Sequence, residues 1–140
     1  MPSRFTYILA ALALIGAVCT SAAGTTRPLP VTMLEGTVTR VVDGDTIRIS
    51  ARRFETPVRL VGIDTPETRD PRRPIQCYGP QATAMTERLL PVGTRVLVQS
   101  DPTQAVRDRY GRFLGYVFRD GVPANPTRSV NHTLVRTGRA

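Results

Sequence analysis

Short runs of alternating apolar and polar residues, separated by Gly and Pro turn signals, constrain the fold of this chain more than any other feature of its sequence. The runs predict strands at 33–42, 46–50, 57–63, 94–99 and 112–118. Residues 80–90 begin with Pro and repeat apolar side chains at helical spacing, so they predict a helix. Residues 130–137 predict a short second helix, which Gly138 could cap.

The order of these elements narrows the fold class. The first three strands form a meander, because their connections are short, and a tight turn near 52–55 joins the second strand to the third. Five short strands with one helix between the third and the fourth are typical of an OB-fold. The chain is therefore predicted to be an α+β, mainly β protein, a five-stranded OB-fold barrel with that helix and a short C-terminal helix.

The N-terminal residues have the composition of an export signal. Arg4 precedes an uncharged apolar segment at 5–18, and small residues at 21–23 stand at the usual cleavage spacing. We therefore expect a secreted protein, with a membrane-attached form through an uncleaved signal or a lipidated Cys19 as the alternative. Cys77 would then remain alone, and it is interpreted as a small semi-buried apolar residue rather than a reactive thiol. The expected organisation is a signal peptide at 1–23, a linker at 24–32 and one domain at 33–140.

The balance of charge favours an anionic partner. Nineteen basic residues, all Arg, oppose eleven acidic residues, which gives a net charge of +8. A small domain this basic commonly binds phosphate groups or an anionic surface. A basic surface that serves only solubility is the alternative.

Two carboxylates are predicted to meet at one end of the second and third strands. Asp45, which follows Asp43 and Gly44, starts the second strand, and Asp64 ends the third. Both lie about equally far from the turn between these strands, so they are expected to be near-opposite. Carboxylates brought together repel each other unless they share a cation or a proton. With a neighbouring backbone carbonyl, their oxygens suit a hard cation such as Ca²⁺, whereas ordinary turn chemistry is the alternative for either Asp alone.

Three further side chains complete a set that suits phosphodiester hydrolysis. Glu67 follows in the loop after the third strand, Arg59 lies on that strand, and Arg112 begins the fifth. Hydrolysis needs a general base for water and cationic donors for the charged transition state. Taken singly, each Arg is better explained as a solvated surface residue. The single histidine, His132, is interpreted as a surface or packing residue.

The spacing of Arg59 and Asp64 makes a geometric prediction. The two residues are five apart, so strict alternation would send their side chains to opposite faces of the third strand. Both reach one site only if the strand is irregular between them, and Gly62 is the natural position for a bulge. The sequence therefore predicts interrupted pairing near 61–63.

Five blocks of the sequence, in this order, resemble the staphylococcal nuclease-like thermonucleases. They are VVDGDTI at 41–47, VRLVGIDTPET at 58–68, YGPQATA at 78–84, DRYGRFLGYV at 108–117 and, more loosely, NHTLVRTG at 131–138. The resemblance covers about 36–138 and implies an OB-fold, Ca²⁺-dependent nuclease that cuts DNA and RNA to leave 3′-phosphate ends. The sequence departs from the family in two places: residues 122–129 resemble an insertion in the last hairpin, and the sequence ends at Ala140, where the family continues into a third helix.

The resemblance implies roles for eight residues around one phosphodiester. They are Asp45, Asp64 and the Thr65 carbonyl for calcium, Glu67 for activating water, Arg59 and Arg112 for the scissile phosphate, and Arg109 with Tyr110 for the terminal nucleotide. The functional hypothesis is accordingly a secreted, monomeric, calcium-dependent nuclease with DNA and RNA as substrates. The alternatives are a non-catalytic OB-fold domain that binds nucleic acid through charge, and a poorly folded, C-terminally short remnant.

Overall fold

The structure, a computed structural model, describes residues 29–65, 78–119 and 125–139. Its strands close into a barrel in the spatial order β1-β2-β3-β5-β4. The strands are β1 (Met33–Val41), β2 (Thr46–Ala51), β3 (Phe54–Leu60), β4 (Arg95–Gln99) and β5 (Phe113–Arg119). The helices are α1 (Gly79–Leu89), the short 3-10 helix η1 (Pro126–Arg128) and α2 (Val130–Arg136). The predicted five-stranded OB-fold barrel, with one helix between the third and fourth strands and a short C-terminal helix, is confirmed.

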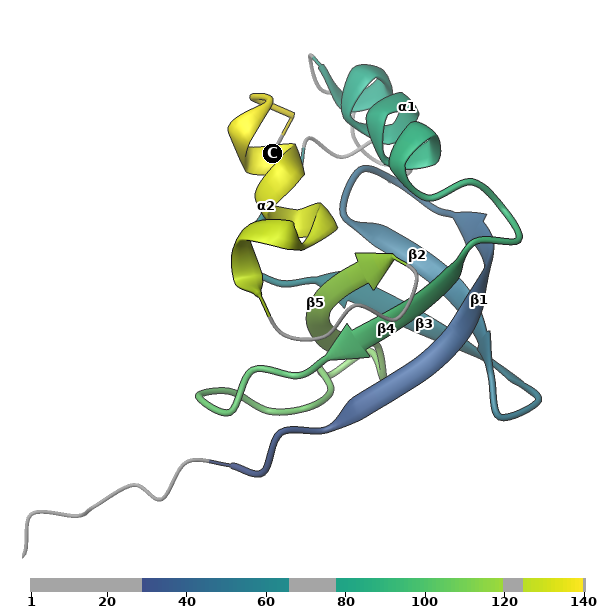
Figure 1. Ribbon diagram of the computed structural model, residues 1–140, viewed down its shortest axis with the longest axis vertical. Helices are drawn as coiled ribbons and strands as arrows, with labels where there is room; N and C mark the ends of the chain where they lie inside the picture. Colours follow the sequence, from purple (N-terminus) through teal and green to yellow (C-terminus); the bar gives the residue numbers. More distant parts are fainter. Residues whose placement is uncertain (1–28, 66–77, 120–124, 140) are drawn as a thin grey trace, which may run out of the picture.

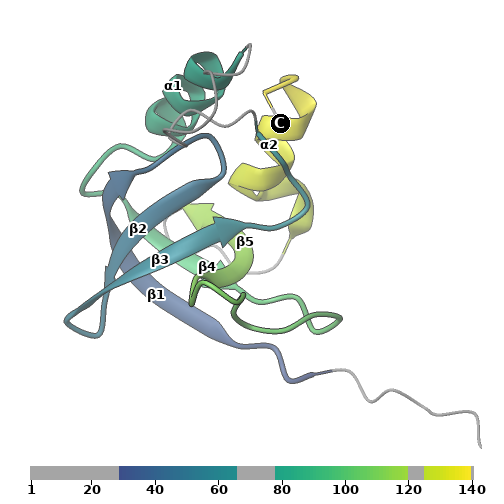
Figure 2. The same cartoon turned by 180° about the vertical axis from the view of Figure 1, so that it is seen from behind.

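The barrel combines an antiparallel meander with one parallel contact. Strands β1, β2 and β3 pair antiparallel in sequence order, as the short connections predict. Strand β5 then pairs parallel with β3 and antiparallel with β4, and β4 returns to β1 and closes the barrel. Figures 1 and 2 show this closed arrangement from two sides.

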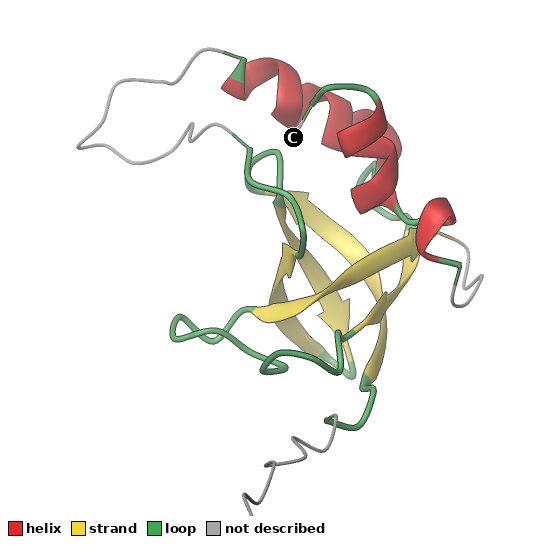
Figure 3. Cartoon of the chain, turned by 90° about the vertical axis from the view of Figure 1, so that its left-hand side faces the viewer, coloured by secondary structure: helices red, strands yellow, loops and turns green. Residues whose placement is uncertain are grey.

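The core lies inside the barrel and is almost wholly aliphatic. Its strand residues lie at alternating positions of β2 to β5, except that Val38 and Val41 of β1 are three apart; they are Val38, Val41, Ile47, Ile49, Val58, Leu60, Val96, Val98, Phe113 and Val117. Both helices lie over one end of the barrel (Figure 3), where Leu90 and Leu134 are completely buried. Within the described ranges, no helix has the length and apolar character needed to cross a membrane.

Helix α2 ends as the sequence predicts. Gly138 adopts a φ of +65°, a conformation that costs other residues more. Its backbone N–H donates to the Val135 carbonyl, and the N–H of Arg139 donates to the Leu134 carbonyl. These two bonds satisfy carbonyls that the end of a helix would otherwise leave unpaired.

The predicted bounds of the third strand were wrong. The sequence places it at 57–63, whereas β3 begins at Phe54 and ends at Leu60. The hairpin turn is only two residues long, because Arg52 and Arg53 both adopt positive φ angles, of 49° and 72°. The sequence predicts a longer turn, near 52–55, because two-residue turns usually carry Gly, Asn or Asp, and Phe54 and Glu55 are therefore not assigned to the strand. Pro57 also suggested that the strand starts there. It lies before the stretch of β3 that pairs with β5, so its missing N–H removes no hydrogen bond between these two strands.

Candidate active site

The loop between β1 and β2 holds the first candidate carboxylate in a tight turn. The backbone N–H of Asp45 donates to Asp43 Oδ1 at 3.2 Å, and Thr86 of α1 donates its hydroxyl to the Gly44 carbonyl at 2.7 Å. A Cβ atom at Gly44 would lie 2.7 Å from Thr65 Oγ1 and 2.8 Å from Ala82 Cβ. Only glycine therefore lets the loop pack this closely against α1 and the chain after β3.

Asp45 is buried, and both of its oxygens accept from several donors. The backbone N–H and the hydroxyl of Thr65 each donate to Oδ2 at 2.9 Å. Thr46 donates its hydroxyl to Oδ1 at 3.0 Å, and Arg59 Nη1 forms an ion pair with the same oxygen. The side chain of Asp45 is only 2% exposed, so these contacts replace the water that the carboxylate loses. Asp45 and Thr65 are thus brought together through the N–H and hydroxyl of Thr65, whereas the resemblance assigns a role to the Thr65 carbonyl.

The guanidinium of Arg59 connects the two predicted carboxylates. Its Nη1 contacts Asp45, and its Nη2 donates to Asp64 Oδ1 at 2.9 Å and to the Ile63 carbonyl at 3.3 Å. The side chain of Asp64 is 93% exposed, in contrast to that of Asp45. Asp45 and Asp64 therefore both pair with the guanidinium of Arg59. A shared cation of this kind offsets the repulsion expected between two neighbouring carboxylates.

The predicted interruption of the third strand is confirmed, in the form of a turn. Strand β3 ends at Leu60, and Gly62 follows with a φ of +74°. The turn reverses the side-chain alternation that would have separated Arg59 from Asp64, so the two reach the same site.

Arg112 is held in place by Asp108 from the loop before β5. Its Nε donates to Asp108 Oδ2 at 2.7 Å, and its backbone N–H donates to Asp108 Oδ1 at 3.0 Å. Burial alone would raise the pKa of Asp108, but hydrogen bonds from Arg112 and Tyr110 outweigh it and hold that pKa below its usual range. Arg112 Nη1 also lies 3.5 Å from the Thr46 hydroxyl, which itself donates to Asp45. Arg112 therefore belongs to the same site as Arg59, with Thr46 between them.

Tyr110 is exposed, and its aromatic ring lies beside the guanidinium groups of Arg109 and Arg112. Its ring centroid lies 4.8 Å from Cζ of Arg109 and 5.4 Å from Cζ of Arg112. Arg109 Nη2 also contacts the Tyr110 hydroxyl at 2.6 Å. Tyr110 is 66% exposed as a residue, so a planar group from solvent has access to its side chain. Glu67, the predicted base, lies outside the described residues, as do Cys77 and the predicted signal peptide.

Asp43 adds negative charge next to Asp45. Burial, the charge of Asp45 and a side-chain contact with Asp45 raise the pKa of Asp43 to about 6. The raised pKa means that the folded protein resists having both carboxylates ionised, and a cation bound nearby would relieve that repulsion.

We expect Asp43→Asn to remove a pH dependence of stability between about pH 4 and pH 6. Folded Asp43 keeps its proton up to about pH 6, whereas the unfolded chain releases it near 3.8. The folded state therefore binds more protons over this range, and the free energy of unfolding falls as the pH rises through it. At neutral pH the variant should be more stable by about 1–2 kcal/mol, once solvent screening is allowed for. Urea unfolding of both proteins across this range measures the difference, and parallel pH profiles would contradict it.

Three residues that shape the site have no signal in the sequence pattern. Thr86 and Asp108 position the loop of Asp45 and the side chain of Arg112, as described above. Asn131 of α2 is 3% exposed and donates through Nδ2 to the carbonyls of Val61 and Gly115 at 2.8 and 3.2 Å. Its Oδ1 accepts the backbone N–H of Val117 at 3.0 Å. Asn131 thereby fixes the turn that follows β3, and only its place on the apolar face of the predicted helix could have drawn attention to it.

Comparisons with known proteins agree with the motifs in the sequence. A family model described as staphylococcal nuclease homologue matches residues 57–140. A thermonuclease of Staphylococcus hyicus is 42% identical over 81 residues, which cover 58% of this chain and 46% of the relative. The SPbeta prophage-derived endonuclease YokF of Bacillus subtilis is 37% identical over 108 residues, covering 77% of this chain and 34% of the relative. An uncharacterized endonuclease of Escherichia coli O157:H7 is 41% identical over 108 residues, covering 76% and 60%. The chain thus spans 34–60% of the length of these relatives.

Proposed function

This chain belongs to the family of staphylococcal nuclease homologues, and we propose that it is a nuclease that hydrolyses phosphodiester bonds of DNA and RNA. The observation that carries the proposal is the cluster in which Arg59 bridges the buried Asp45 and the exposed Asp64, with Arg112 joined to it through Thr46. The apolar segment at 5–18 further supports a proposal that the enzyme is secreted.

Calcium is the cofactor that we assign to Asp45, Asp64 and the carbonyl of Thr65. Both carboxylates contact one guanidinium, so the space between them accepts positive charge, and carboxylate oxygens fit a hard cation. In the described part of the chain, the side chains of His, Cys, Asp and Glu form no group of three that could hold a metal ion. Among the described residues, a cation here would take backbone oxygen, such as the Thr65 carbonyl, as a further ligand. When bound, Ca²⁺ would supply positive charge beside the phosphate.

The side chains of the site have separate roles in the proposed reaction. Arg112, oriented by Asp108, donates to the phosphate oxygens as negative charge develops on them. Arg59 contacts the same phosphate after it gives up its ion pair with Asp64. Losing this pair costs little free energy, because Asp64 is exposed to solvent. Glu67 accepts a proton from the attacking water. The oxygen of this water forms a bond to phosphorus while the bond between phosphorus and the 5′ oxygen breaks. The 5′ oxygen takes up a proton from solvent and leaves as a hydroxyl, and a 3′-phosphate end remains.

The exposed ring of Tyr110, with Arg109 beside it, is proposed to bind the terminal nucleotide. An aromatic face stacks on any base, and the neighbouring guanidinium groups supply charge for the phosphate. This arrangement makes no hydrogen bond that would distinguish one base from another, so it is consistent with cleavage of both DNA and RNA.

We expect Glu67→Gln to slow cleavage by about 10²–10⁴-fold, the usual contribution of a general base. Binding of single-stranded DNA should change little, because the carboxylate acts mainly in the transition state. Single-turnover cleavage and oligonucleotide binding of the two proteins measure the two effects separately. If binding weakened in proportion to the rate, Glu67 would instead be a positioning residue.

A further inference from the structure

Two arginines face each other across β1 and β2 on the outside of the barrel. Val38 pairs with Ile49 inside the barrel, and the register then shifts between Val38 and Arg40. This bulge makes Thr39 an extra residue, so that Arg40 turns outward and lies directly opposite Arg48. Without the bulge, strict alternation after the buried Val38 would point Arg40 into the core.

This pairing leaves one positive charge uncompensated. Like charges directly opposite each other destabilise a sheet. Arg48 is relieved by Glu55 at 3.0 Å, and Glu55 also accepts the hydroxyl of Thr39 at 2.9 Å. Arg40 is exposed and forms no ion pair with any described residue. The fold thus presents a pair of Arg side chains at a cost in stability, which is the arrangement expected of a surface that binds an anion.

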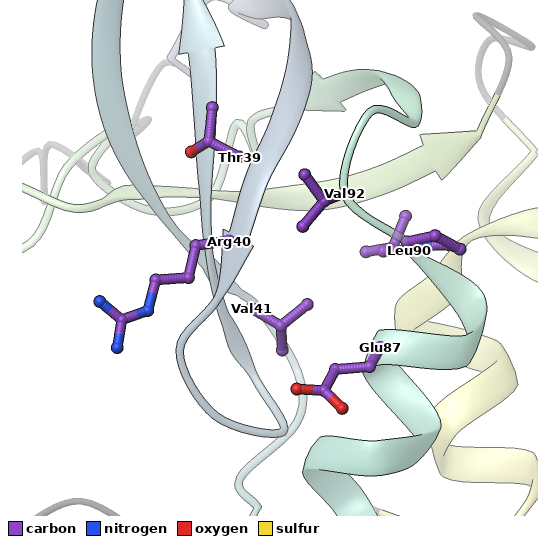
Figure 4. Close-up of a pocket in the computed structure, with 7 residues that line it drawn as sticks. Thr39, Arg40, Val41, Glu87, Leu90 and Val92 are labelled. Atoms are coloured by element: carbon purple, nitrogen blue, oxygen red, sulfur yellow. The ribbon is translucent and has the colours of Figure 1, made fainter.

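A neighbouring acid does not neutralise Arg40. Glu87 of α1 and Arg40 line the same cavity of about 390 Å³, together with Val41, Leu90 and Val92. Figure 4 shows that the Arg40 side chain extends away from Glu87 and from the apolar wall of this cavity. The guanidinium is therefore directed to solvent on the outer face of the sheet.

The exposed pair continues into the candidate active site. Arg48 lies opposite Pro57, and Thr46 lies opposite Arg59, so Arg59 is the diagonal neighbour of Arg48 on the same face. Diagonal neighbours of this kind are about 7–8 Å apart, and paired residues about 5 Å. Arg40, Arg48 and Arg59 thus form one line across β1, β2 and β3, which run side by side (Figure 2), and we call this line the arginine row.

We propose that the arginine row follows the substrate strand, with Arg40 and Arg48 binding its backbone phosphates beyond the phosphodiester that Arg59 contacts. The row contains no aromatic side chain, so it would contact phosphates rather than bases, without preference for sequence. Glu55, held by Arg48 and Thr39, is the one acidic side chain on this face among the described residues next to the pair, and it opposes binding. The position of the cut rests on the proposed function, but binding of a strand by the row does not require cleavage.

Two variants test the arginine row by DNA binding without cleavage, one that removes a positive charge and one that removes a negative charge. Fluorescence anisotropy of a fluorescein-labelled thymidine dodecamer is measured in excess chelator over a series of salt concentrations, with a gel to show that the strand stays intact. Arg40→Thr should weaken binding about 3–10-fold at low salt and reduce the salt slope by about 0.7, the contribution of one phosphate contact to a single strand. Glu55→Gln removes the opposing carboxylate and should tighten binding about 2–5-fold.

The matched control is Arg136→Thr, which removes an exposed Arg from α2. We expect it to change binding by less than about 2-fold, because general attraction to a distant charge is screened. Equal effects of the Arg40 and Arg136 variants on binding, or weaker binding by Glu55→Gln, would overturn the proposed role of the arginine row. Thermal unfolding shows that each variant is folded, and Arg40→Thr should be at least as stable as the parent protein.

A separate cleavage assay with Ca²⁺ distinguishes the two proposals. A parent protein that does not cut DNA, but whose binding responds to Arg40 and Glu55 as expected, would overturn the proposed function and leave the row. A protein that cuts DNA while Arg40→Thr binds as the parent does would overturn the row alone.

Discussion

Asp45→Asn should lower the rate of DNA cleavage by about 10²–10³-fold or more, because it removes the charge that organises the site. Both oxygens of Asp45 accept hydrogen bonds, and Oδ1 pairs with Arg59. The Asn side chain keeps one acceptor oxygen. Whichever way its amide is turned, the NH₂ group points at groups that are themselves donors. The variant therefore loses the proposed calcium ligand and also the anchor of Arg59.

The stability of Asp45→Asn should change much less than its activity. Removing one partner of a buried ion pair is destabilising, yet Arg59 keeps its contact with Asp64. The substitution also relieves the repulsion that raises the pKa of Asp43. Initial rates on single-stranded DNA, with thermal unfolding in parallel, measure both quantities. Asp101→Asn, which removes a carboxylate from the loop between β4 and β5, is the matched control and should retain activity within about 2-fold, as a surface change away from the site. Equal activity of the two variants would contradict the proposed role of Asp45.

Asn131→Ala should lower the free energy of unfolding by about 3–5 kcal/mol, because three buried partners each lose a hydrogen bond at once. Val117 loses the acceptor of its N–H and the Val61 carbonyl loses the Asn131 donor, whereas the Gly115 carbonyl loses one donor and keeps the N–H of Val61. For a domain of this size the melting temperature should fall by about 10–20 °C. Cleavage should fall as well, because the Val61 carbonyl belongs to the turn that brings Asp64 towards Arg59.

The matched control for this prediction is Asn125→Ala. Asn125 is exposed and accepts from the backbone N–H and the hydroxyl of Thr127 at the start of η1. Its loss should cost about 1 kcal/mol, the usual value for a helix cap. Urea unfolding of the two variants and the parent protein measures the contrast. Similar losses for Asn125 and Asn131 would show that the buried bonds of Asn131 are not a main tether of the site.

Alternation and turn chemistry in the sequence are sufficient to predict the barrel. Ile47 and Ile49 are fully buried with Arg48 between them, as the period of two requires. The predicted irregularity after Arg59 is also found, because only a turn at Gly62 allows Arg59 and Asp64 to meet. In these cases a local rule and the global fold demand the same conformation.

The features that the sequence did not reveal depend on contacts between distant segments. The bulge at Thr39 shows only in the pairing of β1 with β2, so the outward direction of Arg40 could not be read from β1 alone. Thr86 and Gly44 are 42 residues apart, and Asn131 and Val61 are 70 residues apart. A polar residue on an apolar helix face has no unique partner until the tertiary structure supplies one.

The meeting of the described candidate site residues was predictable, but their contacts were not. Carboxylates at the ends of adjacent strands indicated Asp45 and Asp64 from spacing alone. The sequence did not indicate that Arg59 would pair with both of them, nor that Asp108 would orient Arg112. Such pairings depend on side-chain direction at the strand ends, which alternation specifies only while the strand stays regular.

The most direct test of the account is the cleavage of single-stranded DNA by the purified protein, in Ca²⁺ and in excess chelator, with Asp45→Asn alongside. We expect rapid cleavage to products with 3′-phosphate ends in Ca²⁺, no cleavage in chelator, and little cleavage by the variant in either condition. Removal of the 3′-phosphate by a phosphatase, followed on a gel, identifies the product ends. Full activity of the parent protein in excess chelator, or of Asp45→Asn in Ca²⁺, would contradict a calcium-dependent nuclease centred on Asp45.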